Sequence, residues 1–336
     1  MRHTLGDKME NEVSAIIYQI IILTLLGATG YIAGKKKVLP ADTHKYISAL
    51  ILKITMPFLL FTTMGNYSFT SDTLKNGLLI SVFGALFVLI SGLIGLVSTK
   101  LFGIKDKAKN VYIASSMFGN VIFMAYPLIR AMYGDNGDMG IVYAIFFNIA
   151  NDAILWTVGV YLFNKHKATS WKENLSHLLN PNIIAFLGGF VIIGLKQFFH
   201  IDQYPMYSKA WDIVYSAFNG LGHTTIYLSM IFIGLILANI KINGIKYLIS
   251  RWRFLFFSLS KLLIVPLIAL LFFSLFNFDS NVVKIVVVQL GMPAATIVSA
   301  LALQYDSDYN TATEGVFFST ILSVFSLPLL VYLISL

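Results

Sequence analysis

Residues 111–130 of the chain read VYIASSMFGNVIFMAYPLIR. The run is mostly apolar and long enough to cross a bilayer, because a helix of about 20 residues spans the hydrocarbon layer. Gly119-Asn120 and Pro127 interrupt it. A proline inside a helix removes a backbone hydrogen bond, and in lipid the freed carbonyl group must find another partner. The sequence therefore predicts a broken membrane helix whose break is covered by protein or lines a water-filled cavity.

Residues 281–304 contain a second run of this kind, in which Gly291-Met292-Pro293 precedes Thr296. One proline in a membrane helix usually means only a kink, because Gly and Pro are frequent in such helices. Two interrupted helices in corresponding positions of two halves instead point to a binding site near the middle of the bilayer. The exposed N–H groups at the start of each half-helix attract anions.

The composition indicates a chain that is surrounded mostly by lipid. Hydrophobic residues make up 57% and charged residues 12% of the 336 positions, which is too apolar for a water-soluble domain. The net charge of +8 does not indicate a nucleic-acid partner, because the basic residues lie in short clusters that suit anionic lipid headgroups. The chain has no cysteine, and its six histidines lack metal-ligand spacing, so neither a metal nor a cofactor is expected.

The hydropathy pattern predicts an all-α integral membrane protein with ten transmembrane helices. The expected spans are 13–34, 43–64, 74–99, 111–130, 138–163, 182–199, 209–240, 252–276, 281–304 and 311–335. Residues 1–12 form a polar tail ahead of the first span. The seventh span is long, and its Asn219-Gly220-Leu221-Gly222 stretch predicts a separate interfacial helix ahead of the span proper.

Basic residues predict the orientation, because short loops rich in Lys and Arg stay on the cytoplasmic side. They gather in alternate loops, at residues 35–45, 100–109, 165–172 and 241–253. Both termini are then expected outside the cytoplasm, in a multi-pass protein of the plasma membrane.

The longest basic connection, residues 164–180, divides the chain into two five-helix halves, 13–163 and 181–336. Because five is odd, the halves enter the membrane from opposite sides and would form an inverted repeat. Pro127 and Pro293 fall at nearly the same distance from the start of their halves, which supports this arrangement.

Three polar residues give the fifth predicted span a polar face. Asp152 lies near the middle of this span, with Asn148 and Asn151 on the same side. An unpaired carboxylate costs about 2.5–3.5 kcal/mol at this depth, so Asp152 should face protein. It either binds a proton that is coupled to transport or, with its asparagines, ties helices together by hydrogen bonds.

Two lysines lie within other spans. Lys53, one turn before Pro57, is either a counter-charge for Asp152 or for a substrate carboxylate, or a lysine whose ammonium reaches the membrane interface. Lys261 is expected to reach the interface, because it lies close in sequence to Arg253.

The run from Gly119 to Pro127 resembles the N-x-G-F-x-G-x-P signature of the auxin efflux carrier family. Three residues match it, Asn120, Phe123 and Pro127, and two stand in place of its glycines, Ile122 and Ala125. MPAA at 292–295 is similar to the M-P-x-A/S element of that family, and STILS at 319–323 and LPL at 327–329 look typical of it. The likeness covers almost the entire chain from about residue 13.

The resemblance implies two inverted five-helix repeats in which helices 4 and 9 are broken at prolines and cross. It also implies a small organic anion as substrate, since family members carry auxin in plants and malate or malonate in bacteria. The long central loop of the plant members is replaced here by the short connection 164–180. A bacterial permease for a mono- or dicarboxylate is therefore expected, with an auxin-like aromatic carboxylate exporter as the alternative.

We predict that the substrate binds beside the crossing point of the broken helices. The residues expected there are Asn120, Tyr126, Pro127, Gln289, Pro293 and Thr296, with Asp152, Asn148, Asn151 and Lys53 as a coupling site or polar centre. The expected function is secondary transport by alternating access, with proton or cation coupling and a homodimer left open. An enzyme is not expected, because the spans hold no nucleophile with a base and no acids with metal ligands. A channel or sensor on the same fold is a further alternative.

Overall fold

The computed structural model is helical over most of the residues that it describes, which are residue 18 and residues 21–40, 42–67, 70–164, 181–199, 204–239 and 251–335. In these ranges the only extended pairing is one isolated antiparallel bridge. The predicted all-α class is therefore confirmed for this part of the chain.

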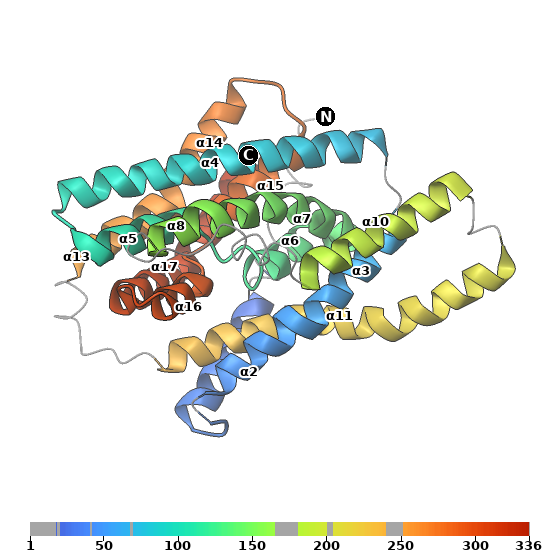
Figure 1. Cartoon of the computed structure of the whole chain (residues 1–336), viewed down its shortest axis with the longest axis horizontal. Coiled ribbons are helices and arrows are strands. Elements are labelled where there is room, and N and C mark those ends of the chain that lie inside the picture. Colours follow the sequence, from blue (N-terminus) through green and yellow to red (C-terminus); the bar gives the residue numbers. More distant parts are fainter. Residues whose placement is uncertain are drawn as a thin grey trace.

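In chain order the helices are Ile21–Lys35, α2 (Thr43–Leu50), α3 (Met56–Asn66), α4 (Ser71–Leu101), α5 (Asp106–Met117), α6 (Ala125–Tyr133), α7 (Gly137–Ile154), α8 (Val160–Asn164), α10 (Pro181–Phe199), α11 (Pro205–Asn239), α13 (Trp252–Leu259), α14 (Val265–Ser274), α15 (Ser280–Leu290), α16 (Thr296–Gln304) and α17 (Tyr309–Ser335). Short π-helical turns, Ile51–Thr55, Leu155–Gly159 and Ser260–Ile264, join α2 to α3, α7 to α8 and α13 to α14. In Figure 1, α4, α7 and α11 run roughly along the long axis of the molecule, whereas α14 is inclined to it.

Six stretches of helix are long and apolar enough to cross a membrane, so the chain is a multi-pass membrane protein. They are Thr43–Asn66, Ser71–Leu101, Ala125–Phe163, Pro205–Ala238, Trp252–Ser274 and Tyr309–Ile334. The third of them reverses direction at Gly134, whose φ of +54° suits glycine, and α6 packs against α7 beyond that turn. Shorter apolar helices, Ile21–Lys35, Pro181–Lys196 and Ser280–Leu290, lie in three further predicted ranges.

The seventh predicted span differs from its expectation. α11 runs without interruption from Pro205 to Asn239, so residues 219–222 do not separate an interfacial helix. Gly222 lies against the backbone of Leu59 in α3, so close that an added Cβ would overlap it. Packing against α3 thus supports a continuous helix at a place where glycine alone would permit a break.

The helices form two groups that meet along one face. In the first group, α10 and α11 pack on α3, and α11 also packs on α2; the helix Ile21–Lys35 contacts α11 where Gly30 lies against the backbone of Ile231. In the second group α4 packs on α5, α7 and α15, and α17 packs on α13 and α16. Figure 1 shows α2, α3 and α11 along the lower side, with α4 and α7 above them.

Two helices of the second group are interrupted. α5 ends at Met117 and α6 begins at Ala125, while α15 ends at Leu290 and α16 begins at Thr296. Both interruptions fall inside the predicted runs, but their relation to proline differs. Pro293 lies within the second break, whereas Pro127 is the third residue of α6. Since the first four N–H groups of a helix have no partner inside it, Pro127 is tolerated after the break and does not mark its position.

Candidate substrate site at the paired helix breaks

The two breaks are hydrogen-bonded to each other. The backbone N–H of Asn120 donates to the carbonyl oxygen of Pro293 at 2.7 Å, and the N–H of Ala295 donates to that of Phe118 at 2.9 Å. Together they enclose the antiparallel bridge between Gly119 and Ala294. An unpaired backbone N–H or carbonyl group costs several kcal/mol in a membrane. The two breaks therefore stabilise each other, because each supplies hydrogen-bond partners for backbone groups that the other break leaves unpaired.

Side chains complete the first break. The Oδ1 atom of Asn120 accepts a hydrogen bond from the backbone N–H of Phe123 at 3.2 Å, in the manner of a helix cap. Gly119 lies close to the other break, since a Cβ there would be 3.3 Å from the Cβ of Met292, a contact that would require a small shift of that side chain. Asn120 therefore ties the break together with both its backbone and its side chain.

A serine from α17 supports the second break. The Ala294 N–H donates to Ser319 Oγ at 3.0 Å, and that hydroxyl donates to the carbonyl of Gly315 at 2.7 Å. In the sequence, Ser319 stands out only as part of the segment STILS at 319–323. Its role follows from its place on a helix that faces the break.

The carbonyl end of α5 receives a buried lysine, which corrects the expectation that Lys261 reaches the interface. Lys261 is 3% exposed, and its Nζ lies 2.9 Å from the Ser116 carbonyl oxygen and 3.4 Å from that of Met117. Ser91 Oγ of α4 also donates to the Ser116 carbonyl. The ammonium thus lies beside the break, where helix-terminal carbonyls offer acceptors that lipid lacks.

The polar face of α7 contacts α6 beside the first break. Asn148 Nδ2 donates to the Tyr126 hydroxyl at 2.7 Å, and both residues are buried. The Oδ1 atoms of Asn148 and Asn151 are buried without a hydrogen-bond partner. Asp152 is half-buried, within hydrogen-bonding range of the Asn151 side chain and electrostatically close to Tyr126. Three residues of the predicted polar centre therefore gather near Tyr126.

Gln289 is the most unusual side chain beside the breaks. It lies in the last turn of α15 and is 1% exposed, yet neither its Oε1 nor its Nε2 atom has a partner. A buried polar atom without a partner costs about 1–3 kcal/mol, so such a group in a native protein calls for an explanation such as a ligand or water. The side chain can both donate to and accept from a small polar ligand.

The remaining predicted residues are placed differently. Pro293 is buried within its break, and Thr296 is the half-buried first residue of α16. Lys53 lies in the π turn between α2 and α3 with its side chain exposed, outside the cluster formed by Asn148 and Tyr126. Among the described residues, no group of three or more His, Asp and Glu side chains is arranged to hold a metal ion.

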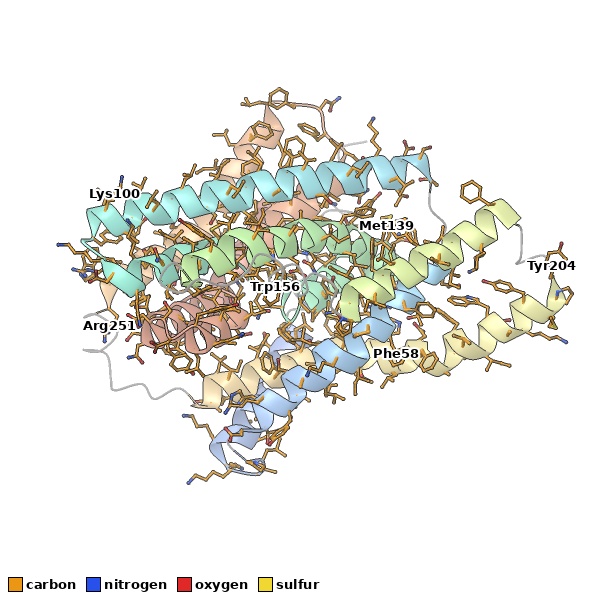
Figure 2. All side chains as sticks on the ribbon, in the orientation of Figure 1. Phe58, Lys100, Met139, Trp156, Tyr204 and Arg251 are labelled. Atoms are coloured by element: carbon orange, nitrogen blue, oxygen red, sulfur yellow. The ribbon has the colours of Figure 1, made fainter. Side chains whose placement is uncertain are left out.

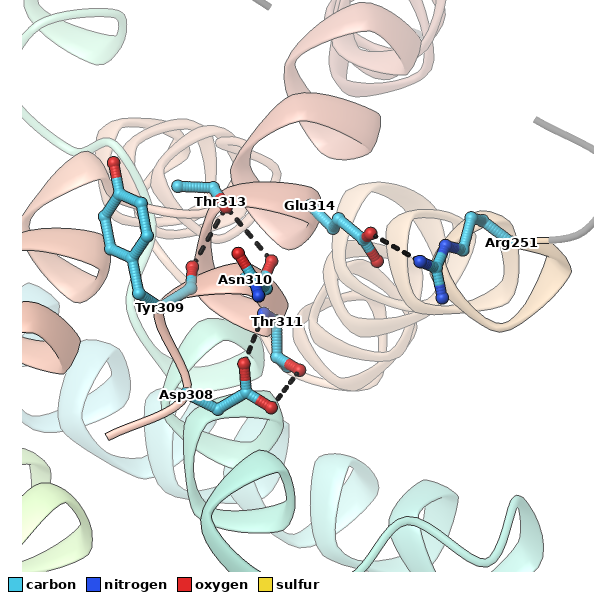
Figure 3. Close-up of polar contacts among 7 residues, drawn as sticks. All are labelled: Arg251, Asp308, Tyr309, Asn310, Thr311, Thr313 and Glu314. Atoms are coloured by element: carbon cyan, nitrogen blue, oxygen red, sulfur yellow. Dashed lines mark hydrogen bonds and ion pairs between the residues drawn. The ribbon is translucent and has the colours of Figure 1, made fainter. Parts of the chain in front are cut away.

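A second polar region lies at one end of the molecule, where α5, α13 and α17 begin. A cavity of about 490 Å³ there is lined in part by Lys105, Arg251 and Glu314. Arg251 pairs with Glu314 at 3.1 Å (Figure 3). The Asp308 carboxylate caps α17 by accepting from the N–H and the hydroxyl of Thr311. Lys100 and Arg251 mark this end in Figure 2, and Tyr204 lies at the opposite end.

Comparisons with known proteins relate the chain to membrane transporters. A family model described as membrane transport protein matches residues 15–331. An uncharacterized transporter of Methanocaldococcus jannaschii is 22% identical over 314 residues, which cover 92% of this chain and 96% of that protein. One of Methanothermobacter thermautotrophicus is 24% identical over 322 residues (93% and 95%), and the uncharacterized transporter YfdV of Escherichia coli is 24% identical over 330 residues (93% and 95%). The family model spans nearly the whole chain, so the protein is a membrane transporter that belongs to the membrane transport protein family, the auxin efflux carrier family.

Proposed function

We propose that this transporter is a secondary carrier that moves a small organic anion, such as a mono- or dicarboxylate, by alternating access across the plasma membrane. The observation that carries the proposal is the pairing of the two breaks beside Gln289, whose buried amide has no partner on either atom. In many secondary transporters, the ends of interrupted helices near the middle of the bilayer form the substrate site.

The start of α16 is the stronger anion-binding end of the two half-helices. In α6 the first N–H groups already donate to the break, because Ala125 bonds to the Asn120 carbonyl and Tyr126 to that of Ile122. α16 begins at Thr296 without a side-chain cap, and the positive end of its dipole favours a carboxylate. Gln289 Nε2 and the Thr296 hydroxyl would add donors to the same ligand.

The proposed topology has ten spans in an inverted repeat, with both termini outside. Two observations support it. Helices lie in each of the ten predicted ranges. Lys100 and Arg251, from two of the basic loops, lie at one end of the molecule, whereas Tyr204, from a loop expected outside, lies at the other (Figure 2). That separation is expected if the basic end is cytoplasmic.

Alternating access would move the group that contains the breaks against the other group. The contact between them is largely apolar and aromatic: Phe123 of the first break packs on Phe232 of α11 with ring centroids 4.6 Å apart, and Phe146 of α7 meets Phe186 of α10. Apolar contacts lack fixed hydrogen-bond geometry, so such an interface can shift without breaking directional bonds.

The test is uptake of labelled malate, malonate and an auxin-like indole carboxylate into liposomes that contain the purified protein. Gln289→Ala should reduce uptake of the true substrate by roughly ten-fold or more, because a hydrogen bond to a charged group contributes about 1.5–3 kcal/mol. Gln304→Ala is the matched control, since Gln304 is exposed at the end of α16 and its loss should leave uptake unchanged.

The outcome also separates the alternatives. A carrier gives saturable uptake that unlabelled substrate competes away, whereas a channel gives flux that rises without saturation. Transport of the indole carboxylate alone would favour the aromatic exporter. Equal uptake by Gln289→Ala and the wild type would mean that the substrate does not bind at the breaks.

A further inference from the structure

The carbonyl end of α5 is built as a cation site. α5 ends at Met117, and the N–H of Phe118 bonds back to the Ala114 carbonyl. The carbonyl groups of Ser116 and Met117 therefore lie beyond Ala114, the last helical acceptor, at the negative end of the half-helix dipole. In secondary transporters such half-helix C-terminal carbonyls coordinate monovalent cations.

Lys261 occupies this position with its own charge. Its ammonium donates to both carbonyls, at 2.9 Å and 3.4 Å. It thus places a positive charge at these carbonyls. The described residues give it no carboxylate partner, so carbonyl oxygens alone offset its burial. A buried charge costs several kcal/mol unless it is paired or hydrogen-bonded, which makes an incidental placement unfavourable.

Neighbouring elements hold the lysine in place. Lys261 lies in the π turn Ser260–Ile264, and π turns inside α-helices are frequent at functional sites. The turn ends two residues before Pro266, which lacks the N–H that a regular helix would use there. Ser91 Oγ approaches the Ser116 carbonyl from α4, so three helices meet around the ammonium.

We propose that the carbonyl end of α5 is a monovalent-cation site that Lys261 fills permanently, so that this transporter needs no sodium or potassium ion at its break. Removal of the side chain would leave a small space bounded by two carbonyl oxygens and the Ser91 hydroxyl. These are the neutral oxygen ligands that sodium and potassium ions accept. A small-residue variant should therefore gain a dependence on these ions.

The test is thermal unfolding of the purified protein in sodium, potassium or choline chloride at equal concentration. This readout needs no substrate, so its failure is separable from failure of the proposed function. The wild type should melt at the same temperature in the three salts. Lys261→Ala should melt lower in choline, by an amount on the order of 5 °C or more, and sodium or potassium should restore part of the loss in a saturable way.

Two variants serve as controls. Lys261→Met fills the same space with an uncharged chain and should melt lower without rescue by any ion. Lys196→Ala removes a lysine that donates to the Gly65 carbonyl at 2.7 Å, beside the last residue of α3, and packs on the Trp211 ring. It lies in the other helix group, so its melting temperature should not depend on the salt.

A chemical variant covers the case in which Lys261→Ala does not fold. Because the chain has no cysteine, Lys261→Cys can be alkylated with 2-bromoethylamine at that position alone, which restores an ammonium of nearly the same reach. The aminoethylated protein should melt near the wild type in every salt. The proposal is overturned if sodium or potassium stabilises the wild type relative to choline, or if a folded Lys261→Ala protein melts identically in all three salts.

Discussion

At the scale of single residues, Pro127 and Pro293 occupy matching places in the sequence but act differently. Pro293 supplies the carbonyl that accepts from Asn120, whereas Pro127 belongs to the first turn of α6. The sequence could locate both interruptions, since Gly, Asn and Pro weaken a helix wherever they occur. It could not assign the partner of each carbonyl, because that depends on residues of another helix.

The lysines illustrate the same limit. Lys53 and Lys261 both lie within predicted spans and near a proline, yet Lys53 is exposed and Lys261 is buried. Which side of a helix faces protein is set by neighbours that are distant in sequence. The polar face of α7, by contrast, was visible in the spacing of Asn148, Asn151 and Asp152, because this spacing places them on one side.

A variant of Asp152 can test whether this carboxylate binds a coupled proton or only holds helices together by hydrogen bonds. If Asp152 binds a proton that is coupled to transport, Asp152→Asn should abolish the dependence of uptake on an imposed pH gradient, because the amide keeps the shape of the side chain but cannot take up that proton. The measurement is uptake into liposomes with and without the gradient. Asp138→Asn, in the same helix but paired with Arg130 at the N-terminal end of α7, should retain the dependence. A wild-type response in Asp152→Asn would leave Asp152 only a hydrogen-bonding role.

At the scale of helices, the spans were largely predictable and their ends less so. The third span was expected at 74–99, and α4 covers Ser71–Leu101, because the polar first and last turns of a helix carry no hydropathy signal. The two breaks were expected from residue type. Their pairing at Gly119 and Ala294 was not, since nothing local in either segment specifies the other.

Glycines set how closely the first helix approaches α11. A Cβ on Gly234 would overlap the Gly27 carbonyl oxygen and the backbone of Tyr31, so Gly234→Ala must push the helices apart, at about 1–3 kcal/mol. We expect a lower melting temperature by scanning fluorimetry. Gly220→Ala, in the same helix with open space around it, should keep or raise the melting temperature, because alanine favours a helix over glycine by about 1 kcal/mol. Equal melting of the two variants would contradict this packing.

At the scale of the whole molecule, the question is whether the two helix groups move relative to each other during transport. Phe123 and Phe232 contact each other across the two groups. If the groups move during transport, a covalent link between cysteines at these positions, in the double variant Phe123→Cys and Phe232→Cys, should stop uptake almost completely. If the link contains a disulfide bond, its reduction should restore uptake. The absence of native cysteine makes the link specific.

The matched control links Phe83→Cys to Phe273→Cys. These residues belong to α4 and to α14, which packs on α4 and α15 of the second group, and their ring centroids are 5.2 Å apart. This link should leave uptake near the wild-type rate. Full activity of the Phe123–Phe232 link would mean that transport proceeds without relative motion of the groups.

The mutual bonding of the two breaks also bears on how the chain is made. When the ribosome has synthesised the segment around Asn120, the carbonyl of Pro293 and the N–H of Ala295, its eventual partners, do not yet exist. The early half must therefore wait in the translocon or the bilayer with open backbone groups until the late half is inserted beside it. The two breaks can therefore pair only after the late half of the chain has been made and inserted beside the early half.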